Sequence, residues 1–390
     1  MSNNQIPAHL DALGSTRDQP TSRMGDVDEA VRRAFLALQA AVKSPLLENN
    51  GLDVALRCYA ARLVEPSLDS NALGSGSLTD DVDALLEDLR KELYFRYEET
   101  EDINHLNLAV EYSEIATKMT ASDHPDYKTR LDFLAQLLET RFISEGTFLD
   151  IENAIQFTRA AVIATKDNDD EIVRRWSNLG KRLGRRYGSG GTIDDLEEGI
   201  SYLSQAVKVP NHPIFSESLV ELAFCLELRF DELAEIKDLD EAISLRRQAL
   251  RATIHQDEFW LDCLRNLAND LEVRYKSIKQ LLDLQNAINL ARTAITRMEI
   301  IGPDYYLAGA CFYELGTKLG LLYEKTNIIN HVDEAIICSL KGVGATESPK
   351  EVSRHLEHLW TLRYRNTQDI NDFRQASTWA EDAARWERAD

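Results

Sequence analysis

The sequence predicts an all-α protein built as a solenoid of seven helix pairs, and two recurring features lead to this prediction. The first is an aromatic residue, defined as position 0 of each repeat, that returns at intervals of 41 to 48 residues. It stands at Tyr97, Phe142, Tyr187, Phe230, Tyr275, Tyr323 and Tyr364. The second is a small residue at position +12 and another at +19, as in Ala109 and Ala116. Because this register holds while the connecting lengths vary, it indicates one helix-pair unit stacked on copies of itself.

The first helix of each repeat is predicted by apolar or small residues at positions −11, −8, −7, −4 and 0. In the fifth copy these are Leu264, Leu267, Ala268, Leu271 and Tyr275. The offsets follow a 3.6-residue period and predict one buried stripe. An arginine at position −1 is expected to pair with the start of a neighbouring helix, and it recurs as Arg96, Arg141, Arg186, Arg229, Arg274 and Arg363.

A turn of about seven residues is expected after the aromatic, followed by the second helix. An aspartate at position +8 is predicted to be its N-cap, where a carboxylate accepts the unpaired amide hydrogens of the first turn. This aspartate recurs as Asp150, Asp195, Asp238, Asp283 and Asp372. His105 and His331 replace it in the first and sixth copies, so those helix starts are expected to be looser. The small residues at +12 and +19 lie two turns apart and let a neighbouring helix approach closely.

The region before the repeats divides into two segments. Residues 1–25 are polar and lack periodicity, which predicts a disordered tail. Residues 26–79 are predicted to form an N-terminal helical cap and a linker, with an apolar stripe that stays outside the repeat register. The repeat solenoid is expected to fill residues 80–390.

Composition narrows the class of protein. The formal net charge of −22 lies almost entirely after residue 79, and it disfavours nucleic acid and anionic membrane surfaces. It favours a basic partner, or else serves solubility alone. No apolar run approaches the roughly 20 residues of a membrane span, and the first 24 residues hold no signal-peptide core. The five cysteines lie singly, as expected of small buried thiols in a reducing compartment. We therefore expect a cytoplasmic protein without a cofactor.

The repeats resemble tetratricopeptide repeats. In that family the first helix carries Leu followed by Gly or Ala, and the second carries Ala, a large residue four positions on and Ala seven positions on. The third copy shows this pattern in Leu179, Gly180, Gly199, Leu203 and Ala206. The copies are longer, about 45 residues instead of 34, with roughly two extra turns at the end of the first helix.

The longer form, with phrases such as DLDEAISLRRQAL (238 to 250), looks like the repeat arrays of large filamentous-fungal proteins. In those proteins the array often precedes a caspase-like CHAT peptidase domain. The resemblance implies a right-handed superhelix of antiparallel helix pairs. This sequence holds no segment similar to the peptidase, so no peptidase activity is carried over.

The resemblance further implies that the first helices line a concave groove, with positions −10, −6 and −3 facing it. Residue types at these positions change from copy to copy, which suits either a recognition face or neutral solvent exposure. We expect a protein or peptide partner to contact this face. The candidate residues are Lys91, Gln136, Ser177, Lys181, Phe224, Arg265, Asn269, Tyr313, Thr317, Arg354 and His358.

Two further clusters were weighed as sites. The basic helix Arg174–Arg186 precedes a glycine-rich segment and could hold an anion, although no Lys-Ser/Thr follows and a P-loop is excluded. Neutralisation by acidic residues of the next helix is favoured, so charge reversal at Arg185 and Arg186 is expected to leave folding intact. His355 and His358, with Glu357, form only a weak metal-site pattern.

The favoured function is a binding scaffold rather than an enzyme. The alternatives are an enzyme or small-molecule binder with a pocket inside the superhelix, and a recognition fragment of a CHAT-type peptidase system. No Ser/His/Asp or Cys/His signature and no cofactor motif supports the enzyme. A closed, largely apolar cavity with convergent titratable groups would favour it.

Overall fold

A computed structural model describes residues 78–165, 170–253, 258–301, 308–343 and 349–387. The expected tail and nearly all of the expected cap and linker lie outside these ranges. Within them all regular secondary structure is helical, with fourteen helices and no strand. The all-α prediction is therefore confirmed for the part of the chain that the structure describes.

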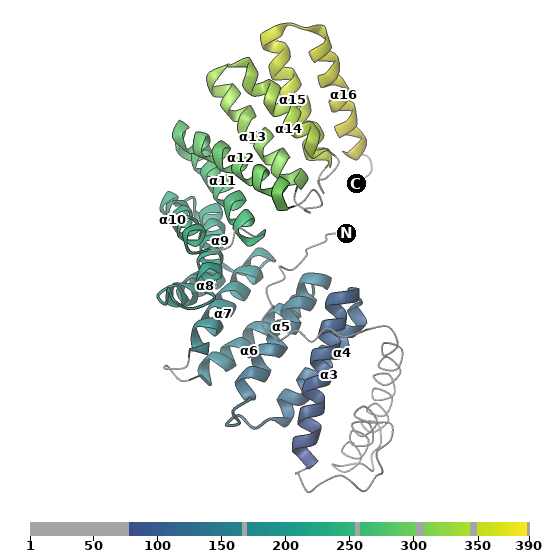
Figure 1. Ribbon diagram of the computed structural model, residues 1–390, viewed down its shortest axis with the longest axis vertical. Helices are drawn as coiled ribbons and strands as arrows, with labels where there is room; N and C mark the ends of the chain where they lie inside the picture. The colour runs from purple at the N-terminus through teal and green to yellow at the C-terminus, as the bar shows by residue number, and fades with distance from the viewer. Residues whose placement is uncertain (1–77, 166–169, 254–257, 302–307, 344–348, 388–390) are drawn as a thin grey trace. The chain divides into compact units, whose positions relative to one another are not determined.

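The helices form seven antiparallel pairs, one for each predicted repeat (Figure 1). The pairs are α3 (Leu78–Thr100) with α4 (Ile103–Met119), α5 (Tyr127–Glu145) with α6 (Phe148–Ile163), α7 (Glu171–Gly188) with α8 (Ile193–Ala206), α9 (Phe215–Leu233) with α10 (Ile236–Ala252), α11 (Glu258–Ile278) with α12 (Leu281–Ile301), α13 (Ala308–Thr326) with α14 (Ile329–Gly342), and α15 (Pro349–Thr367) with α16 (Ile370–Glu387). The chain divides inside α7 into an N-terminal unit that ends at Arg175 and a C-terminal unit that begins at Trp176.

Packing inside each unit follows the predicted register. A second helix packs on the first helix of the next pair, as α4 does on α5 and as α10 does on α11. The stripe residues of the fifth copy are all buried, and so is every small residue at positions +12 and +19. In the third copy glycine stands on both sides of one contact. A Cβ atom added at Gly180 would lie only 2.7 Å from the carbonyl oxygen of Gly199, so these two helices touch through their backbones.

The connection inside each pair is shorter than the predicted seven residues, so that prediction was wrong. The first helix continues three residues past the aromatic, and only two residues separate the helices in every described pair except α7 and α8. The residue at position +4 adopts the left-handed conformation and donates its N–H to the carbonyl of the aromatic, at 2.7 to 2.8 Å. These residues are Glu101, Gly146, Ala234, Lys279, Asn327 and Gln368. Because a left-handed residue ends a helix and turns the chain at once, no longer loop is needed.

The aspartate at position +8 is the third residue of the second helix and not its N-cap, which also corrects the prediction. It accepts the arginine at position −1 instead. Arg141 donates to both carboxylate oxygens of Asp150 at 2.7 Å, and Arg274 does the same to Asp283 at 2.9 and 2.6 Å. The same pair forms in Arg186 with Asp195, Arg229 with Asp238 and Arg363 with Asp372. The expected pairing of this arginine with a helix start is thus confirmed in these five copies, whereas Arg96 of the first copy pairs with Glu92 of its own helix.

The sixth copy replaces both partners of this pair, since Leu322 stands at position −1 and His331 at +8. His331 contacts Thr326 instead, with Nδ1 and Oγ1 3.0 Å apart. In the first copy His105 lies 3.3 Å from Thr100 in the same way. The imidazole therefore joins the two helices of a pair where the aspartate is absent.

The left-handed position predicts opposite effects of glycine at two equivalent sites. Ala234→Gly should raise the free energy of unfolding by about 1 kcal/mol, because the left-handed conformation strains any residue that has a Cβ. Gly146→Ala should lower it by about 1 kcal/mol, although open space surrounds Gly146. Urea denaturation followed by circular dichroism measures both; a shift of both variants in the same direction would contradict the assignment.

The glycine contact between α7 and α8 predicts a packing defect. Gly180→Ala should lower the free energy of unfolding by about 1–3 kcal/mol, because the added methyl group meets the backbone of Gly199. Gly188→Ala is the matched control, since a Cβ atom at that helical position meets nothing within 4 Å. Thermal and urea unfolding should separate the two variants, and equal midpoints would show that the helices can move apart without loss.

Candidate functional site

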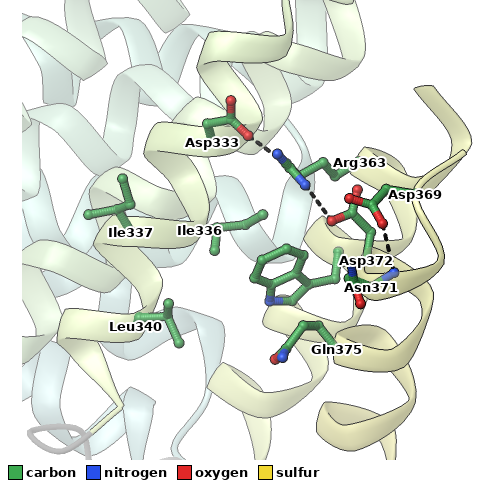
Figure 2. Close-up of a pocket in the computed structure, with 10 residues that line it drawn as sticks. Asp333, Ile336, Ile337, Leu340, Arg363, Asp369, Asn371, Asp372 and Gln375 are labelled. Carbon is green, nitrogen blue, oxygen red and sulfur yellow. Dashed lines mark hydrogen bonds and ion pairs between the residues drawn. The ribbon is translucent and has the colours of Figure 1, made fainter. Parts of the chain in front are cut away.

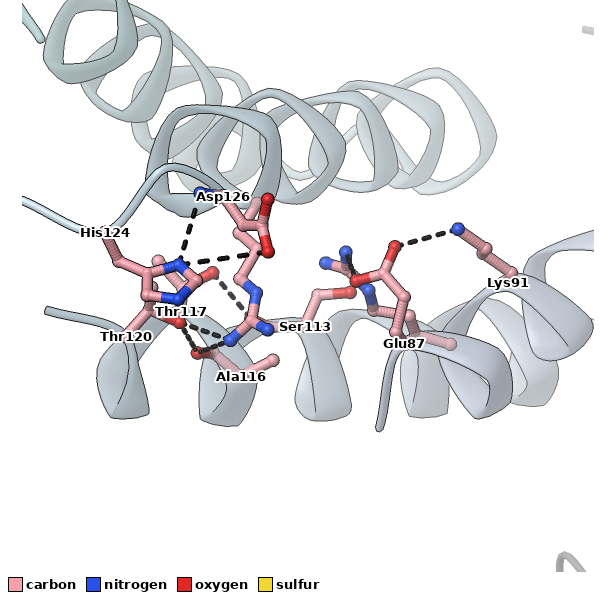
Figure 3. Close-up of polar contacts among 10 residues, drawn as sticks. Glu87, Lys91, Ser113, Ala116, Thr117, Thr120, His124 and Asp126 are labelled. Carbon is pink, nitrogen blue, oxygen red and sulfur yellow. Dashed lines mark hydrogen bonds and ion pairs between the residues drawn. The ribbon is translucent and has the colours of Figure 1, made fainter. Parts of the chain in front are cut away.

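The two candidates in the N-terminal unit make contacts of different kinds. Lys91 is exposed and pairs with Glu87 at 2.9 Å, as Figure 3 shows. Beside it, buried Arg90 pairs with Glu87 and lies over the Phe133 ring, 4.7 Å from its centroid. Gln136 is half-buried and donates weakly to the hydroxyl of Tyr94, at 3.5 Å.

Arginines at position −12 of the same unit cover the ends of preceding second helices. Arg130 donates to the carbonyl of Ala116 at 3.2 Å and to the hydroxyl of Thr120 at the end of α4 (Figure 3). Arg175 donates to Thr165 at 2.9 Å, just beyond α6, and to Asp132 of α5. Arg130 thus bonds a carbonyl in the last turn of α4, and Arg175 joins the segment after α6 to Asp132 of α5, so both charges have a structural use here.

The C-terminal unit holds a group of charged and polar side chains that join α9, α10, α11 and α13. We call this group the polar seam: Glu227 of α9, Arg246 of α10, Arg265, Asn269, Asp270 and Glu272 of α11, and Glu314 and Lys318 of α13. Three of the sequence candidates, Arg265, Asn269 and Tyr313, lie in it or beside it. The seam is where the structure brings predicted site residues together.

The first part of the seam joins α9, α10 and α11. Buried Arg246 donates to the carboxylates of both Glu227 and Asp270. Complete burial, together with the neighbouring Glu227, raises the pKa of Asp270 to about 9 despite Arg246. Burial also opposes ionisation of Glu227, but hydrogen bonds from Asp270 and Arg246 hold its pKa below the ordinary value. Near neutral pH one proton therefore stays on Asp270, which donates it to Glu227.

The second part of the seam joins α11 and α13. Lys318 is fully buried, and its Nζ lies 2.7 Å from the side-chain oxygen of Asn269 and 2.8 Å from Glu272. Burial opposes ionisation of Glu272, yet Lys318 and Lys276 lower its pKa overall. This charge pair fixes two adjacent first helices to each other, since a buried ammonium group without its partner would be strongly unfavourable.

Beside Lys318 the predicted residues Arg265 and Tyr313 complete the group. Arg265 Nε lies 3.3 Å from a carboxylate oxygen of Glu314. Burial raises the pKa of Glu314 in spite of Arg265 and Lys318. The Tyr313 ring meets the His355 ring edge-on, with centroids 5.6 Å apart, and burial lowers the pKa of His355 to about 4. His355 is therefore neutral at physiological pH.

The other candidates of the C-terminal unit separate into accessible and inaccessible ones. Ser177 is buried and accepts a hydrogen bond from Ser218 at 2.9 Å, so it is a packing residue. Phe224 is 40% exposed. Lys181 and Thr317 are half-buried, whereas Arg354 and His358 are exposed.

The two histidines of the metal pattern have different surroundings. His355 faces Tyr313, whereas His358 lies 2.8 Å from Glu324. In the described ranges no group of His, Cys, Asp and Glu has the arrangement of a metal site.

The basic helix α7 is neutralised by several acidic partners. Arg174 pairs with Glu171, Arg175 with Asp132, and Arg186 with buried Asp195 of α8. Gly190, with a φ of 102°, makes the following turn. The favoured neutralisation is thus seen in Arg186. This contact argues against the expectation that charge reversal at Arg185 and Arg186 leaves folding intact, because reversal at Arg186 would place a second carboxylate beside buried Asp195.

Sequence reasoning missed the charged seam residues Asp270 and Lys318, although a signal was present. Both stand at position −5, where the second and seventh copies carry leucine. Other copies carry leucine at this position. A charged residue there indicates that contacts outside the repeat pattern determine the residue type.

Sequence reasoning also missed a surface cavity of about 530 Å³ between α14, α15 and α16. Figure 2 shows Ile336, Ile337 and Leu340 on one side and acidic residues around Arg363 on the other. Arg363 pairs with both Asp333 and Asp372. Three of the titratable groups that line the cavity, Asp333, Arg363 and Asp372, are therefore paired with one another, which does not favour the alternative of an enzyme pocket.

The raised pKa of Asp270 predicts a specific dependence of stability on pH. Between about pH 4 and pH 9 the folded chain retains a proton that the unfolded chain releases, so stability falls as pH rises through this window. Asp270→Asn imitates the protonated carboxyl group and should remove this loss. The difference in the free energy of unfolding between Asp270→Asn and the wild type should therefore grow by about 1 kcal/mol per pH unit between pH 6 and 8, in favour of the variant.

Urea unfolding at pH 6, 7 and 8 measures this difference in the free energy of unfolding. Asp270→Ala is the control, because it removes the hydrogen bond to Glu227 and should be destabilising at each pH. A difference between wild type and Asp270→Asn that does not change with pH would show that Asp270 is ionised in the folded protein.

None of the described helices has the length and apolar character required to cross a membrane.

Known proteins resemble this chain in structure only. No known protein family and no curated protein matches the sequence. The chain is similar to a signal transduction ATPase of Pyrococcus horikoshii described as having a tetratricopeptide repeat sensor, with a TM-score of 0.54 and 12% identity over 94% of this chain and 54% of that one. It thus spans about half of that protein's length. The C-terminal part of a TPR repeat-containing protein from Cytophaga hutchinsonii has a TM-score of 0.47 and 13% identity over 84% of this chain and 99% of that one. The first similarity shows a tetratricopeptide-like helix-pair fold, while the resemblance to fungal CHAT-type proteins stays a prediction.

Proposed function

We propose that the protein is a scaffold that binds a protein or peptide partner on the first-helix face of its C-terminal unit. This face is the surface formed by positions −10, −6 and −3 of α9, α11, α13 and α15. One observation carries the proposal. Side chains at positions −10 and −6 of these helices are exposed or half-buried and differ in type from copy to copy, as Phe224, Thr317 and His358 do at position −6, while the buried stripe keeps its pattern.

Packing within the chain does not explain why an aromatic residue, Phe224, stands on this face. The other six copies carry polar residues at position −6, namely Lys91, Gln136, Lys181, Asn269, Thr317 and His358. Phe224 is 40% exposed, and other copies carry lysine or threonine at the same position. Folding of the repeat therefore does not require an aromatic side chain here. Aromatic anchors of this kind contribute strongly to binding energy at interfaces. Half-buried Val220, one turn earlier on α9, extends the apolar contact.

The polar seam supports the proposal by holding the face rigid. Arg246 and Lys318 are buried between first helices and are satisfied only when α9, α11 and α13 keep their relative positions. A preordered surface loses less entropy when a partner binds. The seam also has a cost, because Asp270 is held protonated far above its ordinary pKa, and such costs concentrate at functional sites.

The partner favoured by charge is basic. The chain has a formal net charge of −22, and Glu221 and Glu227 flank Phe224 on α9. A partner that presents an apolar side chain next to Lys or Arg would meet complementary chemistry at Phe224. The same charge disfavours a nucleic acid as the partner.

Site-specific photo-crosslinking tests this proposal. A photoreactive phenylalanine analogue at position 224 of the full chain should capture a partner in cell extract, which mass spectrometry identifies. Binding of that purified partner should then weaken about tenfold or more in Phe224→Ser, because the aromatic anchor is lost.

The matched control places the same analogue at Ile300, which is 67% exposed on α12, away from the first-helix face. Ile300→Ser should bind the partner as the wild type does. Capture of the same partner from both positions with equal yield, or equal affinity of Phe224→Ser and wild type, would refute the role of this face.

A further inference from the structure

The cavity between α14 and α16 differs in kind from the first-helix face, because second helices form most of its walls. Ile336, Ile337 and Leu340 come from α14 and Gln375 from α16, as Figure 2 shows. Trp360 of α15 also lines the cavity. Its volume of about 530 Å³ lies within the range of about 300–1,000 Å³ in which proteins bind ligands. The question is whether packing of the repeats requires these residues.

Comparison of the seven copies shows that packing does not require two of them. Ile337 stands at position +14, where the other copies carry Glu111, Gln156, Ser201, Ser244, Asn289 and Thr378. Leu340 stands at +17, where the others carry Glu114, Arg159, Ser204, Arg247, Arg292 and Glu381. Both positions are therefore polar in every copy except the sixth. The two aliphatic side chains are 56% and 43% exposed, so they gain little from burial within the chain.

A third departure from the pattern lies at the same place. Position −4 is a fully buried leucine in the first six copies, such as Leu271 and Leu319, but it is Trp360 in the seventh. Trp360 is only half-buried and contributes to the cavity. Three unusual apolar residues from two repeats thus line one cavity.

The polar bridge between adjacent second helices is also replaced here. Between α12 and α14, Arg292 at position +17 pairs with Glu334 at +11, at 2.8 Å. Between α14 and α16 the corresponding residues are Leu340 and Gln375, which both line the cavity. The ion pair that closes this surface one repeat earlier is therefore absent from these two positions, and apolar surface stands in its place.

The rim of the cavity is acidic. Asp333 and Asp372 share the guanidinium group of Arg363, and Asp369 accepts the backbone N–H of Asn371 at 2.9 Å. The rim thus carries three carboxylates and one cationic side chain, which gives an excess of two negative charges when all are ionised. Such a rim attracts a cation and repels an anionic ligand.

We propose that the cavity between α14 and α16 is a second docking site, which takes a basic peptide segment of a partner protein. One apolar side chain of the segment enters between Ile337 and Leu340 and contacts Trp360. Neighbouring Lys or Arg side chains of the segment pair with the excess carboxylates of the rim. This site does not depend on the first-helix face, and either can exist without the other.

Two pools of 12-residue peptides test the proposal with the full chain. Both pools carry Leu, Ile, Phe or Trp at one central position; the first has Lys and Arg around it, and the second has Glu and Asp. Peptides from the basic pool should be retained, and those from the acidic pool should not. The dissociation constant of a retained peptide is then measured by fluorescence anisotropy for wild type and variants.

The decisive variant is Ile337→Ser with Leu340→Arg. Both replacements are residues that other copies carry at the same positions, Ser244 and Arg292, so circular dichroism should show an unchanged helix content. The dissociation constant should rise at least tenfold in this variant. It should stay unchanged in Ile300→Ser, which removes an exposed aliphatic side chain elsewhere, and in Phe224→Ser, which alters only the first-helix face.

Three results would overturn the proposal. They are equal retention of the two pools, retention of no peptide from the basic pool, and equal affinity of the double variant and wild type. Loss of binding in Phe224→Ser with full binding in the double variant would assign the peptides to the first-helix face instead. That result would leave the proposed function standing while this second site failed.

Discussion

In five of the seven copies, the pair between the arginine at position −1 and the aspartate at +8 is the interaction that fixes the two helices of a repeat to each other. Each such aspartate is buried, so its charge requires a partner. Arg141, Arg229 and Arg274 each meet both oxygens of the carboxylate. The arginine also reaches the second helix of the preceding repeat, as Arg274 reaches Asp240 at 2.7 Å and Arg229 reaches Glu197 at 3.2 Å. One guanidinium group therefore sets the position of three helices. Its planar shape fixes directions as well as distances, which apolar packing alone does not. In the N-terminal unit Arg141 makes the same three connections through Asp150 and Asn107, so the geometry recurs in each unit separately.

The sequence predicted those parts of the fold that depend on one residue type at one spacing. The buried stripe and the small residues at +12 and +19 are of this kind, because burial and close approach act at every copy alike. The turn was predicted wrongly because Glu101, Ala234 and Lys279 occupy a left-handed position that normally signals itself by glycine. The aspartate at +8 was assigned three positions too early in its helix for the same reason, since the expected loop was too long. A hydrogen bond to the carbonyl of the aromatic decides this turn, and side-chain type gives no sign of it.

The candidate site could be predicted only in part, because some of its residues are defined by contacts between helices and not by spacing along the chain. The offsets −10, −6 and −3 select Arg265, Asn269 and Tyr313, which the structure brings into or beside the polar seam, while their contact with a partner stays a prediction. They could not select Asp270 or Lys318, because these lie at position −5 and meet their partners only when neighbouring helices pack. The pKa of Asp270 depends on Glu227, forty-three residues earlier, and on Arg246 from the helix between them. No local spacing contains that information. Ser177 shows the converse case, since it satisfies the offset but is buried against Ser218.

Both proposed surfaces are places where the chain departs from its own repeat, and the two kinds of departure differ physically. A charge such as Lys318 at a position that can hold leucine loses hydration, and it is tolerated because Glu272 and Asn269 surround it. An exposed aliphatic residue such as Ile337 at a polar position costs the fold little, but it also adds nothing to it. A buried, paired charge of the first kind holds neighbouring helices in place. An exposed aliphatic residue of the second kind offers apolar surface to a partner. Phe224 stands on the same helix as Glu227 of the seam, whereas Ile337 and Leu340 lie where the bridge between second helices is missing. Repeats with a constant frame can thus carry distinct binding chemistry on first and second helices without changing the contacts that stack them.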